Sequence, residues 1–252
     1  MLKDPIHFNL QQYVRTHNLD PYITSWSSIK TKLKDMQIAA ANLSLKNKPG
    51  FKLITPELIS STLSPSELKL FYSWDGYSKI VSYLNQVVTL GNKRKMKTLN
   101  LLITGPPSIG KTSLFSNPNH DPHERPIQDF TSVYHMGMST WFPEYRSGVY
   151  KLILWNEAKL TSYSYDTILK VLEGSYVDLP VKGGVAPKRD NPLIVMLSNM
   201  TLQQMIQQKF GYSRALMDMA RENLKVRVQN VVVPKGYDLF ILQKLIRSVS
   251  SI

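Results

Sequence analysis

The sequence predicts an α/β fold with a central, mostly parallel sheet. Three short apolar runs, at residues 99–104, 151–155 and 193–197, consist mainly of β-branched residues and leucine and are bounded by turn-forming residues. Continuous apolar runs of this length are typical of strands that are buried on both faces of a sheet. The long stretches between the runs leave room for helices and further elements, so we expect an α/β architecture.

Composition favours a folded protein with a basic surface. The chain has 252 residues and a net charge of +13, with 42% hydrophobic and 19% charged residues. This length allows one or two domains with a buried core. The absence of cysteine excludes disulfides, thiolate zinc sites, iron–sulfur clusters and a cysteine nucleophile. No apolar run approaches the roughly 18 residues of a membrane span. We therefore expect a soluble, intracellular protein without a membrane partner.

The region before the first strand is predicted to be helical. Ser64, Pro65 and Glu67 have the spacing of a capping box with proline at the first helical position. An apolar face continues beyond them and is interrupted at residues 75–76. We expect a small helical subdomain over residues 55–98.

A phosphate-binding loop follows the first predicted strand. Residues 105–112 read G-x-x-x-x-G-K-[ST], after an apolar strand and before a predicted helix, as the motif requires. In such a loop, backbone N–H groups surround the β-phosphate, Lys111 reaches the β- and γ-phosphate oxygens, and Thr112 gives its hydroxyl to Mg²⁺. The alternative is a chance match to this motif, and the strand that precedes residues 105–112 makes a chance match less frequent. The residues expected to hold the nucleotide are Gly105, Pro106, Pro107, Ser108, Ile109, Gly110, Lys111, Thr112 and Ser113.

The second and third predicted strands also end in polar residues. Asn156 and Glu157 follow residues 151–155, where a nucleotide site places its metal-side and water-activating groups. Glu157 is the candidate base. Asn199 follows the third run and can hydrogen-bond the attacking water or the γ-phosphate. Taken singly, Glu157 would usually be a helix N-cap or a loop residue, and Asn199 a turn residue. Three such strand ends in one chain favour a shared nucleotide site.

The order of these motifs resembles the superfamily 3 helicase domain, in particular that of replication initiator proteins from circular single-stranded DNA viruses and related plasmids. The resemblance covers about residues 70–233. Residues 105–112 resemble motif A, residues 141–145 the aromatic element before motif B, residues 181–184 the K-G-G turn of motif B′, and residues 197–199 motif C. The family implies an AAA+-like three-layer core, hexameric rings, ATP with Mg²⁺ as cofactors, and 3′-to-5′ unwinding of DNA.

The resemblance also implies roles for individual residues. Glu157 would activate water, Asn199 would sense the nucleotide, and Thr112, Asn156 and Glu157 would form the metal side of the site. Lys182 would lie on a β-hairpin that faces the central pore and contacts single-stranded DNA. The further DNA-binding candidates, which enclose the same Gly/Pro-containing segment, are Lys188 and Arg189.

A neighbouring subunit in such a ring is expected to supply an arginine that stabilises transition-state charge. Arg227 is the first candidate and Arg221 the second. Because Arg227 stands between Val226 and Val228, the alternative is that it is a surface residue of an edge strand. A further basic run, at residues 93–97, is either a DNA-binding or nuclear-localisation patch or a solvated turn.

The chain departs from the family pattern in two respects. Asn156 replaces the first of two acidic residues that usually end the motif B strand, so weaker Mg²⁺ binding or slower turnover is expected. The five histidines include no His-x-His pair, and none of the thirteen tyrosines has lysine three residues later. We therefore expect no DNA-nicking activity, and interpret the chain as the helicase portion of a split, truncated or diverged initiator.

Three functional hypotheses follow, of which the third is the least favoured. The first is an ATP-dependent DNA helicase of a replication initiator, active in the host nucleus if the virus is eukaryotic. The second is a catalytically weak subunit that binds ATP and DNA for assembly. The third, an unrelated small-molecule kinase, is disfavoured by the charge of +13.

The chain is expected to have three regions. Residues 1–54 form an extension of unknown role with a helix at 27–41, and residues 55–98 form a helical subdomain of the oligomerisation type. Residues 99–252 form the P-loop ATPase domain.

Overall fold

The computed structural model describes residues 53–90, 95–96, 98–115, 133–136, 142, 145–148, 150–181 and 184–250. All of them belong to residues 51–252, which form one compact unit. The helix predicted at residues 27–41 lies outside the described residues, as do Lys93, Arg94 and Lys97 of the basic run.

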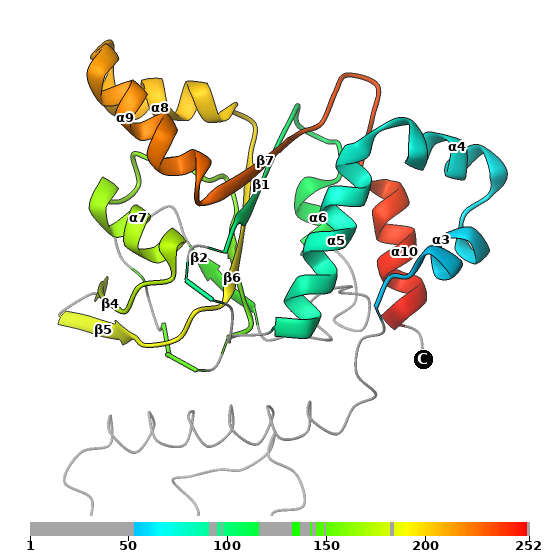
Figure 1. Ribbon diagram of the computed structural model, residues 1–252, viewed down its shortest axis with the longest axis horizontal. Coiled ribbons are helices and arrows are strands. Elements are labelled where there is room, and N and C mark those ends of the chain that lie inside the picture. Colours follow the sequence, from blue (N-terminus) through cyan, green and yellow to red (C-terminus); the bar gives the residue numbers. More distant parts are fainter. Residues whose placement is uncertain are drawn as a thin grey trace, which may run out of the picture. The chain divides into compact units, whose positions relative to one another are not determined.

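A five-stranded sheet forms the centre of this unit (Figure 1). Its strands are β1 (Asn100–Thr104), β2 (Val133–Met136), β3 (Leu152–Trp155), β6 (Leu193–Ser198) and β7 (Val228–Val232). They lie in the order β2-β3-β6-β1-β7, and every neighbouring pair is parallel. The three predicted strands are β1, β3 and β6, and all their residues are buried, as strands covered on both faces require. The predicted α/β fold, with a parallel sheet that leads into a P-loop, is confirmed.

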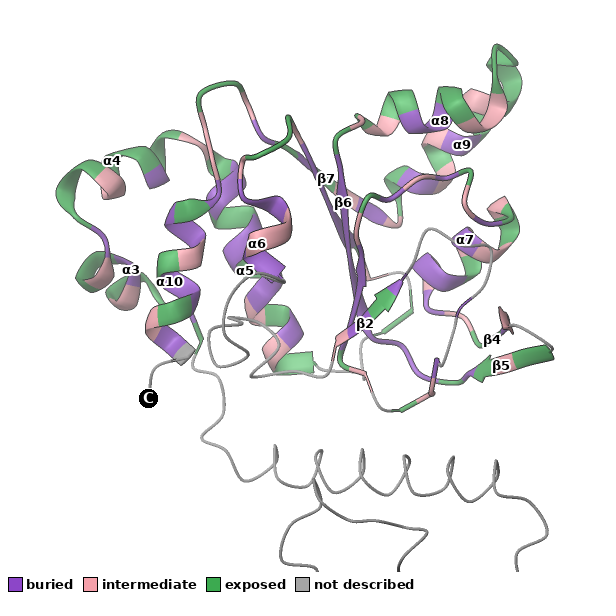
Figure 2. Ribbon diagram, turned by 180° about the vertical axis from the view of Figure 1, so that it is seen from behind, coloured by how far each residue is buried: buried purple, intermediate pink, exposed green. Residues whose placement is uncertain are grey.

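Helices cover both faces of the sheet. They are α3 (Pro56–Thr62), α4 (Pro65–Ser73), α5 (Asp75–Leu90), α6 (Lys111–Phe115), α7 (Tyr165–Glu173), α8 (Leu202–Phe210), α9 (Arg214–Lys225) and α10 (Phe240–Ser250). Helices α5, α6 and α10 lie on one side, and α7, α8 and α9 on the other (Figure 2). Because side chains alternate along a strand, Leu101 and Ile103 join the first core, whereas Leu102 joins the second. None of the described helices combines the length and apolar character needed to cross a membrane.

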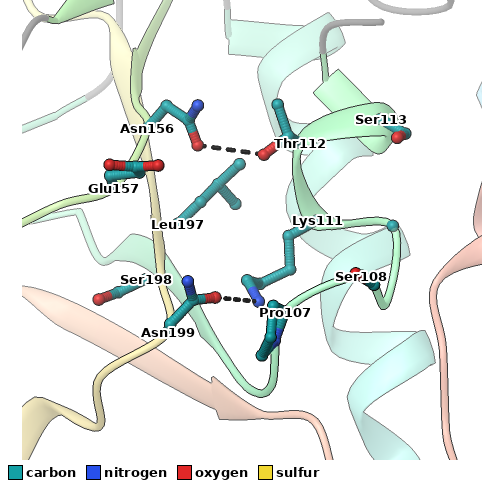
Figure 3. A pocket seen from close by; sticks show the side chains of 11 residues that line it. Pro107, Ser108, Lys111, Thr112, Ser113, Asn156, Glu157, Leu197, Ser198 and Asn199 are labelled. Carbon is teal, nitrogen blue, oxygen red and sulfur yellow. Dashed lines mark hydrogen bonds between the residues drawn. The ribbon is translucent and has the colours of Figure 1, made fainter.

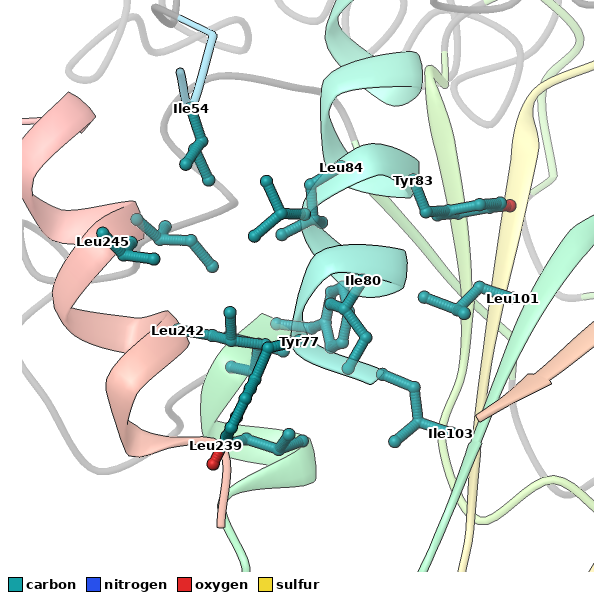
Figure 4. Close-up of a cluster of buried hydrophobic side chains, with 14 of the residues drawn as sticks. Ile54, Tyr77, Ile80, Tyr83, Leu84, Leu101, Ile103, Leu239, Leu242 and Leu245 are labelled. Atoms are coloured by element: carbon teal, nitrogen blue, oxygen red, sulfur yellow. The ribbon is translucent and has the colours of Figure 1, made fainter. Parts of the chain in front are cut away.

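Helix α4 begins where the sequence predicts. The N–H of Ser64 donates to Oε2 of Glu67 at 2.7 Å, and the N–H of Glu67 donates to Oγ of Ser64 at 3.4 Å, so the capping box is present. Helix α5 packs on the sheet through Tyr83, whose hydroxyl donates to the carbonyl of Ile194 at 2.8 Å. Side chains of α5, α10 and β1 meet in one core (Figure 4). The oligomerisation role of residues 55–98 stays a prediction.

A two-stranded antiparallel hairpin stands apart from the main sheet. Its strands are β4 (Val177–Val181) and β5 (Gly184–Lys188). This confirms the hairpin predicted around the Gly/Pro-containing segment. Helix α10 packs into the core on the α5 side of the sheet.

Candidate functional site

A cavity of about 220 Å³ lies at the carboxyl ends of β1, β3 and β6 (Figure 3). Parallel strands end at the same edge of a sheet, so residues that are far apart in sequence meet there. The cavity brings together residues predicted from the sequence to form one site, namely Lys111, Thr112, Asn156, Glu157 and Asn199. The residues that line it are Pro107, Ser108, Gly110, Lys111, Thr112, Ser113, Asn156, Glu157, Leu197, Ser198 and Asn199.

The loop between β1 and α6 has a backbone shape that glycine makes possible. Gly110 has a φ of +85°, in the left-handed region. A Cβ at Gly105 would lie 2.8 Å from Cδ1 of Ile109, so a side chain at this position would collide with the loop. Behind the loop, the N–H of Leu239 donates to the carbonyl of Ile109 at 2.8 Å. Gly105 and Ile109 therefore shape the loop, while Pro107, Ser108 and residues 110–113 line the cavity.

The ammonium group of Lys111 is fully engaged. Its Nζ donates to the carbonyl oxygens of Gly105 at 2.8 Å and Pro106 at 2.6 Å. It also donates to Oδ1 of Asn199 at 2.8 Å (Figure 3). A lysine ammonium has three hydrogens, so these acceptors use all of them. Burial lowers the pKa of Lys111, since desolvation disfavours the charged form. A phosphate that enters the cavity has to replace acceptors that Lys111 already holds.

Thr112 and Asn156 meet on the other side of the cavity. The Thr112 hydroxyl donates to Oδ1 of Asn156 at 3.2 Å (Figure 3). Together with the Glu157 carboxylate they provide the oxygen ligands that Mg²⁺ prefers. One carboxylate and two neutral oxygens suit an ion that is held jointly with nucleotide phosphates. In the described part of the chain, no group of three or more His, Asp or Glu forms a separate metal site.

Glu157 adopts a left-handed backbone conformation with a φ of +49°, which non-glycine residues rarely adopt. Within the described residues, the other non-glycine residue with positive φ is Ser108, and it lines the same cavity. The next residue is held firmly: the N–H of Ala158 donates to the carbonyl of Leu197 at 2.8 Å. The hydroxyl of Ser198 donates to the carbonyl of Ala158 at 3.2 Å. These bonds fasten the end of β3 to β6 and keep Glu157 on the cavity wall.

Arg227 lies at the opposite end of the sheet from the cavity. Its carbonyl accepts from the N–H of Asn100, where β1 begins, whereas the cavity lies where β1 ends. Its guanidinium pairs with the carboxylate of Glu173 at 3.2 Å and donates to the carbonyl of Asn223 at 2.8 Å, and only 13% of the side chain is exposed. The Arg227 guanidinium is thus largely covered and paired within its own subunit, and its role as an arginine supplied to a neighbouring subunit stays a prediction. Arg221, the second candidate, is 41% exposed on α9.

The predicted DNA-binding residues of the hairpin differ in their placement. Lys182 lies outside the described residues. Lys188 is fully buried and its Nζ donates to the carbonyl of Asp190, so the prediction that it contacts DNA is wrong. The reason is strand alternation, which places Lys188 on the inward face of β5. Arg189 is half-exposed and pairs with Asp178 at 2.7 Å, and its role in DNA binding stays a prediction.

Asp190 holds the base of the hairpin, a role that no local pattern in the sequence indicates. The hydroxyl of Tyr145 donates to its Oδ1 at 2.6 Å, and the N–H of Gly148 donates to its Oδ2 at 2.7 Å. Burial, assisted by the bond to Asp190, raises the pKa of Tyr145, so the hydroxyl stays protonated. Tyr145 belongs to the aromatic element noted in the sequence, but its partner lies 45 residues away and carries no local signal. Trp141 of that element lies outside the described residues.

Comparison with known proteins finds low similarity to solved structures. No protein-family model matches the chain, and no characterised protein matches it in sequence. The X-ray structure of the helicase of JCV, a polyomavirus, is similar with a TM-score of 0.39 and 15% identity, over 98% of this chain and 73% of that one. An inhibitor-bound JCV helicase has a TM-score of 0.40 and 15% identity over the same shares. A complex of JCV helicase with a thiazolopyridine compound has a TM-score of 0.40 and 14% identity, over 92% of this chain and 69% of that one. Similarity at this level assigns no function to a residue.

Proposed function

We propose that this chain is an ATP-hydrolysing motor of the superfamily 3 helicase type, which moves along single-stranded DNA as a hexameric ring and belongs to a viral or plasmid replication initiator. The observation that supports this most is the meeting of three strand ends at one cavity. Lys111 lies at the end of the loop that follows β1, and Glu157 and Asn199 follow the ends of β3 and β6. They are a phosphate-binding cation, a base and a water-positioning amide, which ATP hydrolysis requires.

Each side chain has its own task in the proposed reaction. Lys111 moves its hydrogen bonds from the loop carbonyls and Asn199 to the phosphate oxygens. Asn199, thereby released, holds the attacking water, and Glu157 accepts the proton of that water. Thr112 and Asn156 hold Mg²⁺, which when bound neutralises charge that develops on the phosphates.

We also infer that a ring neighbour completes the site. Among the described residues, the cavity lining contains no arginine, and phosphoryl transfer is often accelerated by an arginine from outside the subunit. Because Arg227 is only slightly exposed and is paired with Glu173, Arg221 is the better placed of the two candidates. Its Nε donates to Oε1 of Gln203 at 2.8 Å and its Nη1 pairs with Asp218, partners that it would exchange for phosphate oxygens in the ring.

Charge supports single-stranded DNA as the partner. A net charge of +13 attracts a phosphate backbone. Lys182, which follows β4 in the sequence, and Arg189, which follows β5, are the proposed contacts. Six copies of such a hairpin in a ring would bind DNA with a strong salt dependence and without base readout.

Steady-state ATP hydrolysis with and without single-stranded DNA tests the proposal. Wild type is expected to hydrolyse ATP faster when DNA is present, and Lys111→Ala to lose both ATP binding and turnover. Glu157→Gln is expected to bind ATP but to lose about 100-fold or more of its turnover, since it lacks a base. The matched controls change exposed residues on α9, namely Lys225→Ala and Glu222→Gln. Undiminished turnover in Glu157→Gln would refute the assignment.

A second candidate function is a subunit that binds ATP and DNA for ring assembly with little turnover. It is favoured by Asn156, a neutral amide that contacts Thr112 at the position where a carboxylate would strengthen Mg²⁺ binding. In that case the wild-type chain binds ATP and forms rings, yet hydrolysis stays at background level with and without DNA. The same assay therefore separates the two functions.

A further inference from the structure

An exposed aromatic ring lies beside the phosphate-binding loop. Phe240 is the first residue of α10, and 52% of its surface is exposed. It lies against Gly110: a Cβ built on this glycine would be 3.4 Å from Cε1 and 3.5 Å from Cδ1 of the Phe240 ring. Gly110 also lines the cavity. A single residue without a side chain therefore stands between the ring and the phosphate site.

The backbone of Phe240 is fixed relative to the loop. The N–H of Leu239 donates to the carbonyl of Ile109 at 2.8 Å, and the N–H of Phe240 donates to Oδ1 of Asp238 at 2.9 Å. Leu239 and Leu242 are fully buried in the core beneath it (Figure 4). The ring is thus displayed on a rigid support, and its exposed face is available to a flat, apolar ligand surface.

Gln243, one turn further along α10, approaches the same glycine. Its Nε2 lies 3.4 Å from the position of a Cβ on Gly110, is buried, and has no hydrogen-bond partner among the described residues. Buried donors are rarely left unpaired in folded chains. An acceptor supplied from outside the chain would satisfy it, and purine bases and ribose both carry such acceptors.

We propose that Phe240 stacks on the base of the nucleotide whose phosphates occupy the loop. This rests on the proposed function and adds the group that recognises the nucleoside. Aromatic stacking accepts any base because each has a π face, and a purine offers the larger face. The site therefore selects nucleoside triphosphates over inorganic polyphosphate, and it binds ATP and GTP more tightly than CTP and UTP.

Binding of MgATP and of magnesium tripolyphosphate to the full chain, measured by calorimetry, tests this proposal. Phe240→Ala is expected to weaken ATP binding by about 5- to 150-fold, the range measured for loss of a stacking ring, and to leave tripolyphosphate binding unchanged. Phe240→Tyr retains the affinity for ATP. Tyr212→Ala, which removes a 90% exposed ring that follows α8, is the control and binds both ligands as wild type does.

A second readout uses Phe240→Trp, whose fluorescence is expected to be quenched by ATP and not by tripolyphosphate. Wild-type ATP affinity in Phe240→Ala, or an equal loss of affinity for both ligands, would overturn the stacking role while Lys111-dependent phosphate binding stands. If wild type binds neither ligand, the proposed function fails, and the stacking role fails with it.

Discussion

Lys111 and Asn199 are joined by a hydrogen bond of 2.8 Å from Nζ to Oδ1, although 88 residues separate them in the chain. The bond links the phosphate-binding loop after β1 to the end of β6. Beyond Asn199, the N–H of Met200 donates to Oγ of Ser198 at 3.1 Å, and Thr201 caps α8. A phosphate that draws Lys111 away therefore frees an amide that is directly connected to the helices on the other face of the sheet.

Replacing Asn199 with alanine is expected to separate ATP binding from hydrolysis. The change removes one of the three acceptors that compete with phosphate for Lys111, so calorimetry is expected to give an affinity at least equal to that of wild type. Turnover falls by about 100-fold, because the attacking water loses its amide partner. If Asn199→Ala lost ATP affinity as fully as Lys111→Ala, the competition between Asn199 and phosphate would be disproved.

Asn156→Asp is expected to strengthen the magnesium site. A carboxylate next to the Thr112 hydroxyl adds charge where the amide has none. The Mg²⁺ concentration for half-maximal ATP hydrolysis is expected to fall by about 10-fold, equivalent to about 1.4 kcal/mol, and turnover to rise. Asn156→Ala is the control and shifts the Mg²⁺ requirement in the opposite direction. An unchanged requirement in both variants would place the ion elsewhere.

Glu157→Gly is expected to be more stable than Glu157→Ala, although both lack the base. Glycine tolerates the φ of +49°, whereas alanine keeps the Cβ that disfavours it by about 1 kcal/mol. Urea denaturation gives the two free energies of unfolding, and the expected difference is about 1 kcal/mol in favour of glycine. The reverse order would show that the left-handed conformation at this position is not present in solution.

Glu173→Ala is expected to destabilise the chain and to leave ATP turnover per folded molecule unchanged. The guanidinium of Arg227 loses its carboxylate partner in a setting where little of either side chain is exposed. We expect a loss of about 1–3 kcal/mol, less than for a fully buried pair because some solvent reaches both groups. Asp166→Ala on the same helix, which removes the exposed pair with Lys170, is expected to cost under about 1 kcal/mol. Equal losses in both variants would contradict a structural role for the pair of Arg227 and Glu173.

Acid stability is expected to depend on Glu67. The hydrogen bond from Lys244, and those from Ser64, lower the pKa of Glu67 from 4.5 to about 2. A carboxyl whose pKa is lowered by folding stabilises the chain above its unfolded pKa, and this contribution is lost as the pH falls from 4.5 to about 2. The melting temperature of wild type is thus expected to fall more steeply over this range than that of Glu67→Gln. Parallel curves would show that the Lys244–Glu67 contact does not persist in solution.

Local signals in the sequence were sufficient for the central fold and for the grouping of the candidate site. Apolar runs identified β1, β3 and β6, and the glycine spacing identified the loop that contains Lys111. Because parallel strands share one edge, these signals also brought Glu157 and Asn199 to the same cavity. The strand β2 escaped prediction, since four residues with alternating exposure give too short a pattern.

The placement of single charged residues was decided by the tertiary structure. Lys188 and Arg227 stand in sequences that suit exposed positions, yet one is bonded to Asp190 inside the hairpin base and the other pairs with Glu173, 54 residues away. The aromatic ring of Phe240 likewise lies next to Gly110 only because α10 packs against the loop, so its proposed role could not be predicted from the sequence. Exposure of a side chain depends on the elements that fold around it, and neighbours along the chain carry little information about those elements.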